Sequence, residues 1–298
     1  MVSLKQIRYA LALEKHLHFR KAAADCSISQ SALSTSLSEM EKLLGFAVFE
    51  RDNKKVLITP VGSQFLDKAR NIKLQVDDLM NLADRQRGVL SYSMRIGMIP
   101  SICPYLLPKV LPALNAKHPK FELNVFEEQS ESLVEKVRTG EIDTAILALP
   151  YATDGLLTFE FWQEDLYWIA HHHDVSNTSD AVTAKELEHA DLILLREGHC
   201  LKDHALSACQ LSSDKAKSLN ATSLTTLIQL VRGRFGSTLV PELALDALVH
   251  GNSDLTAKRL VEPGPHRRLA FVVRPNYTNL DDIDELISIF RSELATKG

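Results

Sequence analysis

The sequence is poor in cysteine and has no long apolar run. Four cysteines occur among 298 residues (Cys26, Cys103, Cys200 and Cys209), and in a compartment that keeps thiols reduced they are not expected to form a structural disulfide framework. No stretch approaches the roughly 18 consecutive apolar residues that a membrane helix needs. The apolar run at 9–13 is too short for a secretory signal, and no small-residue cleavage site follows it. We therefore expect a cytoplasmic protein without membrane contact, whose thiols are buried apolar groups, metal ligands or redox-active groups.

A strong excess of charge of one sign is also absent. The chain carries 34 Lys and Arg against 38 Asp and Glu, and 45% of its residues are hydrophobic. These ordinary values exclude a disordered or fibrous chain, and the length predicts about two domains. The first 87 residues hold 14 basic and 10 acidic side chains, so the N-terminal part is the more basic one. This weak bias is in the direction that nucleic-acid contact requires.

Three helices are predicted at the N-terminus. Apolar residues recur at helical spacing from Leu4 to Lys15, a short segment follows at 18–24, and a third helix at 30–44 ends at Gly45. A helix with short polar side chains fits the major groove of DNA and contacts base edges from its N-terminal half. The third helix has such side chains at Gln30, Ser31, Ser34, Thr35 and Ser38.

Residues 46–58 predict a β-hairpin with a basic tip that contains Lys54 and Lys55. Beside a groove-binding helix, this hairpin would be a wing whose cations contact phosphates. The alternative that the pattern leaves open is a solvated three-helix module with incidental lysines.

A long helix is predicted to start with Thr59 at the N-cap and Pro60 at the first helical position. Its apolar side chains recur every three to four residues, at 65/66, 69, 72, 76, 79/80 and 83. Such a seam predicts pairing with the same helix of a second chain, and the dimer would contact two half-sites on DNA. The alternative is that the seam packs on the helix's own domain.

Beyond a break at 86–91, short strands alternate with helices, which predicts an α/β architecture with parallel-type sheets. This part is long for one such unit, so we expect two lobes with a ligand cleft between them. The expected strands are 93–99, 121–126, 143–149, 166–171, 192–195, 236–240 and 269–274, and the expected helices are 105–118, 132–139, 223–232 and 281–295.

The first 65 residues carry the motifs F-R-K-A-A, S-Q-S-A-L-S, E-K-L-L-G, F-E-R and T-P-V-G. In order and spacing, these motifs resemble the winged helix-turn-helix of LysR-type transcriptional regulators. The resemblance implies an all-α winged helix-turn-helix domain at 1–58, a linker and dimerisation helix at 59–90, and a two-lobed α/β effector domain, like that of periplasmic binding proteins, at 91–298. It also implies a homodimer or homotetramer that binds promoter DNA, contacts RNA polymerase, is not an enzyme and needs no cofactor.

The same resemblance assigns DNA-contacting positions. Many family members have Pro where this chain has Ser31, which is a mild departure. Base contacts map onto Gln30, Ser31 and Ser34, and phosphate contacts map onto Arg20, Arg51, Lys54 and Lys55.

The segment from Gly198 to Cys209 resembles the redox segment of the family's peroxide-sensing members, as do 99–108 and 221–224. This resemblance implies that hydrogen peroxide is the signal, that Cys200 reacts with it, and that Cys209 resolves the product. A thiol reductant of the glutaredoxin or thioredoxin type would reset the pair.

The residues around Cys200 have a chemical rationale. A cysteine reacts with peroxide as the thiolate, and His199, Lys202 and a helix N-terminus are expected to lower the thiol pKa. Hydroxyl groups would bind the peroxide and stabilise the departing oxygen; the resemblance assigns this role to two serines that replace the family's usual Thr. Ser218 stands where the family often has a histidine. The full set expected to bind peroxide or tune the thiolate is Ser101, Ser130, His199, Lys202 and Asp203.

Cys200 and Cys209 are nine positions apart. On one regular helix they would be separated by about 13.5 Å along the axis and would lie on opposite faces. A disulfide requires Cα atoms within roughly 7 Å. Oxidation would therefore have to unwind this segment, and its refolding is expected to move the lobes and the dimer contacts.

Two other functions fit parts of the pattern. In a metabolite-responsive regulator, the two cysteines would be structural, and Ser101, Ser130 and Thr222 would bind a carboxylate. In a thiol peroxidase, the cysteine pair would turn over peroxide, which the helix-turn-helix disfavours. The sequence predicts neither a secretory signal nor a transport-type binding protein.

The remaining cysteines and a histidine run have plainer interpretations. Cys26 and Cys103 are expected to be small buried apolar residues. The run at 171–173 is three consecutive histidines, which suggests a metal site. Successive strand residues point to opposite faces, however, and no further ligand motif accompanies the run, so we expect a surface strand end without a metal.

Overall fold

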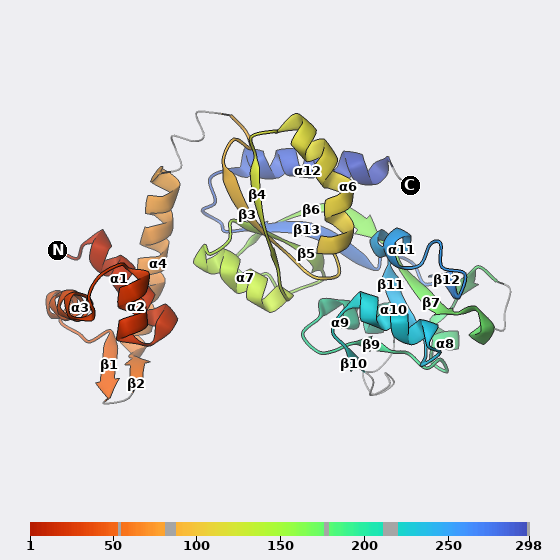
Figure 1. The fold of residues 1–298 in the computed structure, drawn as a ribbon, viewed down its shortest axis with the longest axis horizontal. Coiled ribbons are helices and arrows are strands. Elements are labelled where there is room, and N and C mark those ends of the chain that lie inside the picture. The colour runs from red at the N-terminus through yellow and green to blue at the C-terminus, as the bar shows by residue number, and fades with distance from the viewer. Residues whose placement is uncertain (53–54, 81–87, 176–178, 211–219, 297–298) are drawn as a thin grey trace. The chain divides into compact units, whose positions relative to one another are not determined.

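The structure is a computed structural model that describes residues 1–52, 55–80, 88–175, 179–210 and 220–296. It divides into two compact units, an N-terminal unit of residues 1–86 and a C-terminal unit of residues 87–298 (Figure 1). Within the described residues, no helix is both long and apolar enough to cross a membrane.

The N-terminal unit starts with three helices, which confirms that prediction. The side chain of Ser29 caps the third helix by accepting a hydrogen bond from the Ala32 amide. This helix ends at Gly45, whose φ of 78° is a left-handed conformation that glycine adopts readily. The helices are α1 (Leu4–His16), α2 (Phe19–Asp25) and α3 (Gln30–Leu44).

Small and apolar residues hold the three helices together. Ala22 and Ala23 of α2 are buried, so the short helix packs closely against its neighbours. Leu33, Leu37 and Met40 recur at helical spacing and place one side of α3 in the core. The opposite side of α3 therefore stays available to solvent.

A hairpin and a long helix complete this unit. β1 (Phe49–Asp52) pairs antiparallel with β2 (Lys55–Ile58), as predicted, whereas the tip at 53–54 lies outside the described residues. α4 (Pro60–Met80) begins after Thr59, whose hydroxyl accepts a hydrogen bond from the Gly62 amide at 2.9 Å. The predicted N-cap and first helical position are thus confirmed.

The apolar seam of α4 has two kinds of surroundings. Leu66 and Ala69 are buried where α4 packs against α1, and Arg70 donates to Glu14 at 2.5 Å. Ile72 and Leu79 are 40% and 63% exposed. One part of the seam therefore packs within its own unit, as the alternative interpretation held, and another part is exposed; position 83 lies outside the described residues.

The C-terminal unit has two lobes. Lobe I contains a five-stranded sheet in the order β4-β3-β5-β13-β6. Helices α6 and α12 lie on one side of this sheet and α7 lies on the other (Figure 1), so that β5 is buried along its whole length. Its elements are β3 (Ser93–Met98), α6 (Cys103–Lys117), β4 (Glu122–Glu127), α7 (Ser130–Thr139), β5 (Thr144–Leu149), β6 (Leu157–Glu164), β13 (Arg267–Val273) and α12 (Leu280–Ala295).

Lobe II contains a four-stranded sheet in the order β11-β7-β12-β8 and a short parallel pair, β9 with β10. The chain crosses between the lobes after β6 and again before β13. The elements of lobe II are β7 (Leu166–His171), η1 (His172–Asp174), β8 (Ala181–Val182), α8 (Ala184–Leu187), β9 (Leu194–Leu195), α9 (Cys200–Ala208), β10 (Asn220–Ala221), α10 (Leu224–Arg232), β11 (Thr238–Pro241), α11 (Glu242–Leu248) and β12 (Leu255–Leu260).

The sheets correct the expectation of parallel-type pairing. β3 runs parallel to β4 and β5, but β13 runs antiparallel to both β5 and β6. In lobe II, β7 pairs antiparallel with β11 and β12. The reason is that the chain leaves lobe I after β6 and returns along β13, so the returning strand enters the sheet in the opposite direction.

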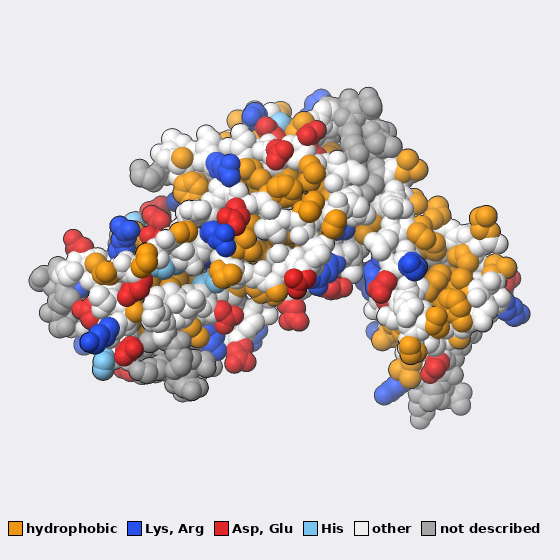
Figure 2. Space-filling model, turned by 180° about the vertical axis from the view of Figure 1, so that it is seen from behind, with side chains coloured by type: hydrophobic (Ala, Val, Ile, Leu, Met, Phe, Trp, Pro, Cys, Tyr) orange, Lys and Arg blue, Asp and Glu red, His pale blue; other side chains and the backbone are white. Residues whose placement is uncertain are grey.

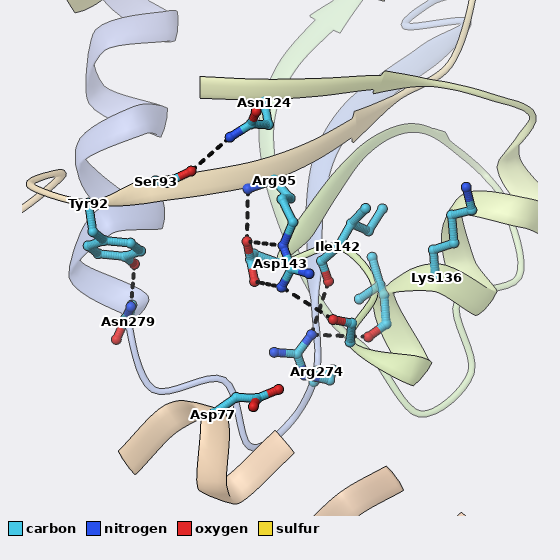
Figure 3. A network of polar contacts seen from close by, with 12 residues as sticks. Asp77, Tyr92, Ser93, Arg95, Asn124, Lys136, Ile142, Asp143, Arg274 and Asn279 are labelled. Atoms are coloured by element: carbon cyan, nitrogen blue, oxygen red, sulfur yellow. Dashed lines mark hydrogen bonds and ion pairs between the residues drawn. The ribbon is translucent and has the colours of Figure 1, made fainter. Parts of the chain in front are cut away.

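A polar network fixes the start of lobe I to α12. The Asp282 carboxylate accepts hydrogen bonds from the Leu90 amide at 2.7 Å and the Tyr92 hydroxyl at 2.5 Å. Asn279 donates to the same hydroxyl (Figure 3). Nearby, Arg95 donates three hydrogen bonds to the Asp143 carboxylate, two from its guanidinium at 2.8 and 3.2 Å and one from its backbone amide at 2.8 Å (Figure 3). The first residues of the C-terminal unit are thus held by groups almost 200 positions away in the chain.

Candidate functional site

Cys200 is the first residue of α9, and its side chain is buried at a small cavity between the lobes. The volume open to the centre of a water-sized sphere is about 10 Å³, which is close to the room that one water molecule requires. Lobe I contributes residues 99–101, 129 and 130 to its walls, and lobe II contributes residues 198–201.

Ser130 is the lobe I residue that faces the thiol. It is the first residue of α7 and is almost fully buried. Its hydroxyl lies against the Cys200 sulfur, a contact that favours the thiolate and so lowers the thiol pKa. The contact falls short of hydrogen-bond geometry, and among the described residues this hydroxyl has no hydrogen-bond partner. Ser130 and Cys200, predicted from the sequence as partners, are therefore brought together.

Gly198 allows the loop before α9 to pack against lobe I. Its φ is +89°, and a Cβ at this position would lie 2.8 Å from Oε1 of Gln129. Glycine is therefore favoured here by the backbone conformation, and a Cβ would in addition make the end of the Gln129 side chain shift.

A Gly198→Ala substitution tests this packing. We expect a loss of about 1–2 kcal/mol from the left-handed backbone alone, and a further loss because Gln129 must move. Urea unfolding measures the total. Gly251→Ala is the matched control, since Gly251 has φ +81° but its Cβ would meet nothing within 4 Å. Equal losses in the two variants would contradict a role for the Gln129 contact.

Arg267 is a site residue that sequence reasoning missed. It is buried at the start of β13, where it donates to Glu164 Oε1 at 2.6 Å, to the Ser101 hydroxyl at 3.0 Å and to the Ser101 carbonyl at 3.1 Å. Its positive charge lowers the pKa of the Cys200 thiol. Ser101 is therefore held by a buried guanidinium, and its hydroxyl oxygen accepts a hydrogen bond from Arg267.

The predicted low pKa of the Cys200 thiol is wrong. Burial raises the pKa of this thiol, and the nearby Asp203 carboxylate raises it further. The opposing effects are the Ser130 contact, the charge of Arg267 and the backbone amide at the helix start. The sequence could not show that lobe I covers the thiol, and this desolvation is the largest effect.

The two cations expected beside Cys200 act differently from the prediction. Burial, together with the charge of Arg196, lowers the pKa of His199, so its imidazole is neutral near pH 7. Lys202 points its ammonium at Glu197, 3.7 Å away. Asp203 is exposed and makes the thiolate less favourable. The helix N-terminus and Arg267 remain as the positive features at the sulfur.

Cys209 lies at the other end of α9, as the residue that follows its last turn. Burial and the charge of Glu262 raise the pKa of its thiol to about 12. Both cysteines are free thiols. The nine-residue helix between them rises about 13.5 Å, so the helical form holds the sulfurs too far apart to bond.

His204 is a second residue that sequence reasoning missed. It is buried on α9, one turn after Cys200, and its Nε2 lies 3.0 Å from the carbonyl oxygen of Pro150 in lobe I. Its spacing of four residues from Cys200 is the signal that could have identified it, because such residues share a helix face.

Two further predicted residues lie outside this arrangement. Thr222, which the metabolite interpretation grouped with Ser101 and Ser130, is exposed and does not line the cavity. Position 218 lies outside the described residues.

The residues expected to contact DNA lie mostly on exposed positions of the N-terminal unit. Arg20, Gln30, Ser31 and Lys55 are exposed, and Ser34 is half-buried. Lys54 and the side chain of Arg51 lie outside what the structure describes. On the face of the molecule in Figure 2, basic and acidic side chains are interspersed, so that any attraction to phosphate there would be local.

The histidine run differs from its predicted geometry. The strand ends at His171, and His172 and His173 belong to the short helix η1. As a result the rings of His171 and His172 stack with centroids 4.7 Å apart, and the rings of His172 and His173 are tilted with centroids 4.0 Å apart. Over the described part of the chain, no group of three potential ligand side chains is placed to hold a metal ion.

Comparison with known proteins covers both units. The "LysR substrate binding domain" matches residues 87–295, and the "Bacterial regulatory helix-turn-helix protein, lysR family" matches residues 4–63. The chain is 37% identical over 296 residues to "HTH-type transcriptional regulator EstR" of Acinetobacter baylyi, covering 99% of this chain and 98% of that protein. It is 34% identical over 294 residues to "Probable hydrogen peroxide-inducible genes activator" of Streptomyces viridosporus, covering 98% and 94%.

A solved structure is also similar over almost the whole chain. It is a cysteine-to-serine variant of OxyR from Corynebacterium glutamicum with hydrogen peroxide bound. The TM-score is 0.68 and the sequence identity is 28%, with 99% of this chain and 94% of that chain covered.

Proposed function

The chain belongs to the LysR family of bacterial transcriptional regulators, and we propose that it senses hydrogen peroxide through Cys200 and passes the signal to promoter DNA. The observation that carries this proposal is the buried thiol of Cys200 at a cavity of water size, with the Ser130 hydroxyl against it. Relatives described as peroxide-inducible activators, and the similar structure with peroxide bound, support the choice of signal.

In the first step, the Cys200 thiolate attacks one oxygen of hydrogen peroxide. The S–O bond forms as the O–O bond breaks, so the sulfur loses two electrons to the peroxide. The products are a sulfenic acid and hydroxide, which takes a proton to become water. Ser130, at the start of α7, and the backbone amides at the start of α9 would donate hydrogen bonds to the departing oxygen.

The raised thiol pKa predicts how this step depends on pH. Because burial raises the pKa of Cys200, the thiolate is the minor form at neutral pH, and its fraction grows about tenfold for each pH unit. The second-order rate constant with peroxide should therefore rise with the same slope up to about pH 9, without a plateau. Stopped-flow measurements on a Cys209→Ser variant isolate this step. A plateau near pH 6–7 would contradict the raised pKa.

In the second step, the Cys209 thiol attacks the sulfenic sulfur. A disulfide forms, and the sulfenic oxygen leaves as water with the thiol proton. Because α9 separates the two sulfurs, this step requires α9 to unwind. A dithiol reductant of the glutaredoxin or thioredoxin type returns both cysteines to thiols and is itself oxidised to a disulfide.

The signal is then passed to the DNA-binding part. We assign residues 1–58 to DNA binding, residues 59–90 to the linker and dimerisation helix, and residues 91–298 to sensing. The exposed Ile72 and Leu79 of α4 support pairing with a second chain, as a homodimer or within a homotetramer. α3 would occupy the major groove with the wing beside it, and the oligomer would contact RNA polymerase at the promoter.

A metabolite-responsive regulator is the alternative, and the relative EstR is named as a transcriptional regulator without a stated signal. The cavity at Cys200 disfavours it, since about 10 Å³ leaves no room for a carboxylate metabolite. A thiol peroxidase is disfavoured by the family, whose members are regulators and not enzymes.

Mass spectrometry of the full-length protein tests the proposal. After treatment with micromolar peroxide, we expect a loss of two hydrogens that maps to a bond between Cys200 and Cys209. Unchanged free thiols in a protein that still alters transcription would overturn it and favour the metabolite reading.

A further inference from the structure

The tautomer of His204 is set by its surroundings. The Pro150 carbonyl oxygen can only accept a hydrogen bond, so Nε2 of His204, 3.0 Å away, carries the hydrogen. Nδ1 is then an acceptor; it is buried and has no hydrogen-bond partner among the described residues. Burial lowers the pKa of this imidazole, with the Pro150 bond acting in the opposite direction. A neutral ring therefore makes one directed hydrogen bond across the boundary between the lobes.

This hydrogen bond is one of two contacts that dock the same face of α9 onto lobe I. Cys200 meets Ser130 at the start of α7, and His204, four residues later, meets Pro150 just after β5. Residues four apart lie one above the other on a helix. The helical conformation of α9 is therefore what allows both contacts at once.

We propose that His204 is a positioning residue that holds α9 in its helical, reduced form by docking it onto Pro150, and that this bond must break before Cys200 and Cys209 can join. The inference rests on the proposed function. His204 lies between the two cysteines, so unwinding that brings the sulfurs together moves its ring. The hydrogen bond consequently opposes the disulfide step, in which the Cys209 thiol and the Cys200 sulfenic acid yield a disulfide and one water molecule. It does not oppose the attack of Cys200 on peroxide.

Three substitutions separate the hydrogen bond from the rest of the side chain. In His204→Gln, the amide nitrogen takes the place of Nε2 and can still donate to Pro150. In His204→Asn, the amide nitrogen takes the place of Nδ1 and cannot reach that oxygen. His204→Leu removes both polar positions. Far-UV circular dichroism establishes that each variant folds.

The midpoint potential of the cysteine pair, measured in glutathione buffers, gives the main result. A buried hydrogen bond that is lost from the reduced form should shift the equilibrium about tenfold toward the disulfide in the Asn and Leu variants, or about 30 mV to more negative potential. The Gln variant should match the unsubstituted protein. Sulfenic acid formation, followed in a Cys209→Ser background, should proceed at the same rate in all four proteins.

Hydrogen exchange of α9 amides in the reduced protein gives an independent result. Exchange should be faster in the Asn and Leu variants than in the Gln variant and the unsubstituted protein, because α9 is less firmly docked. Equal potentials and equal exchange in all four proteins would overturn the docking role and leave the proposed function intact. Failure of the unsubstituted protein to form the Cys200–Cys209 bond would overturn the proposed function. Faster exchange in the Asn and Leu variants would, even then, support the docking role of His204.

Discussion

A Cys200→Ser variant is expected to lose its transcriptional response to hydrogen peroxide completely, while it keeps its fold and its binding to promoter DNA. Serine has nearly the same size as cysteine, but its hydroxyl is not oxidised by peroxide, so the first step cannot occur. A reporter gene under the protein's own promoter measures the response. Electrophoretic mobility shifts with that promoter measure DNA binding.

Two other cysteine variants make this result specific. Cys209→Ser should still form the sulfenic acid at Cys200, which a dimedone label detects, but should form no disulfide. Cys103→Ala is the matched control, because Cys103 is also buried in the C-terminal unit and the pKa of its thiol is raised to about 12. Its response should equal that of the unsubstituted protein. A full response from Cys200→Ser would eliminate the thiol mechanism.

Replacing Arg267 by Ala should cost about 3–5 kcal/mol of unfolding free energy, because Glu164 is then left buried without a counter-charge. Both side chains of this ion pair are completely buried. The neighbouring Arg268 is the matched control: it pairs with Glu160 on the surface, with side-chain exposures of 42% and 40%. Arg268→Ala should cost less than about 1 kcal/mol in the same urea titration.

The role of Arg267 at the thiol can be separated from its role in stability. Removing both charges, in a double variant with Arg267→Met and Glu164→Leu, should recover much of the lost stability, since neither side chain is then a buried lone charge. In this double variant, Cys200 should react with peroxide more slowly than in the unsubstituted protein, because the charge of Arg267 no longer favours the thiolate. A double variant that reacts as fast as the unsubstituted protein would assign Arg267 a structural role only.

The local sequence predicted the N-terminal unit well because its signals are short-range. Ser29 caps α3, Gly45 ends it, and Thr59 with Pro60 starts α4, and each of these depends on neighbours within a few residues. The placement of Cys200 at the start of α9 is also a local effect, because Gly198 and His199 directly before it indicate a helix start.

The direction in which the pKa of the Cys200 thiol is shifted could not be predicted, because it depends on distant parts of the chain. Lobe I covers Cys200 with residues that precede it by 70 positions or more, and this burial is the largest effect on its pKa. Arg267 arrives from a strand that returns to lobe I at the end of the chain. An arginine at the start of an apolar strand is a hint of a buried charge, but its partner Glu164 and its target Ser101 are set by the crossing between lobes.

The antiparallel return of β13 explains a further difference from the prediction. Alternating strands and helices favour parallel sheets, but the pattern does not tell where the chain leaves one lobe for the other. The edge strand β6 and the short β8 and β12 carry mixed polar and apolar residues, so periodicity gave little signal for them.

The walls of the cavity at Cys200 come from both lobes, and in the proposed peroxide sensor this enclosure should favour small oxidants over large ones. Hydrogen peroxide is hardly larger than water, so we expect it to react with Cys200 faster than an alkyl hydroperoxide or a bulky electrophile does. The same enclosure that raises the pKa of the Cys200 thiol should thus limit its reaction with larger reactive compounds, so that a slower reaction accompanies higher selectivity.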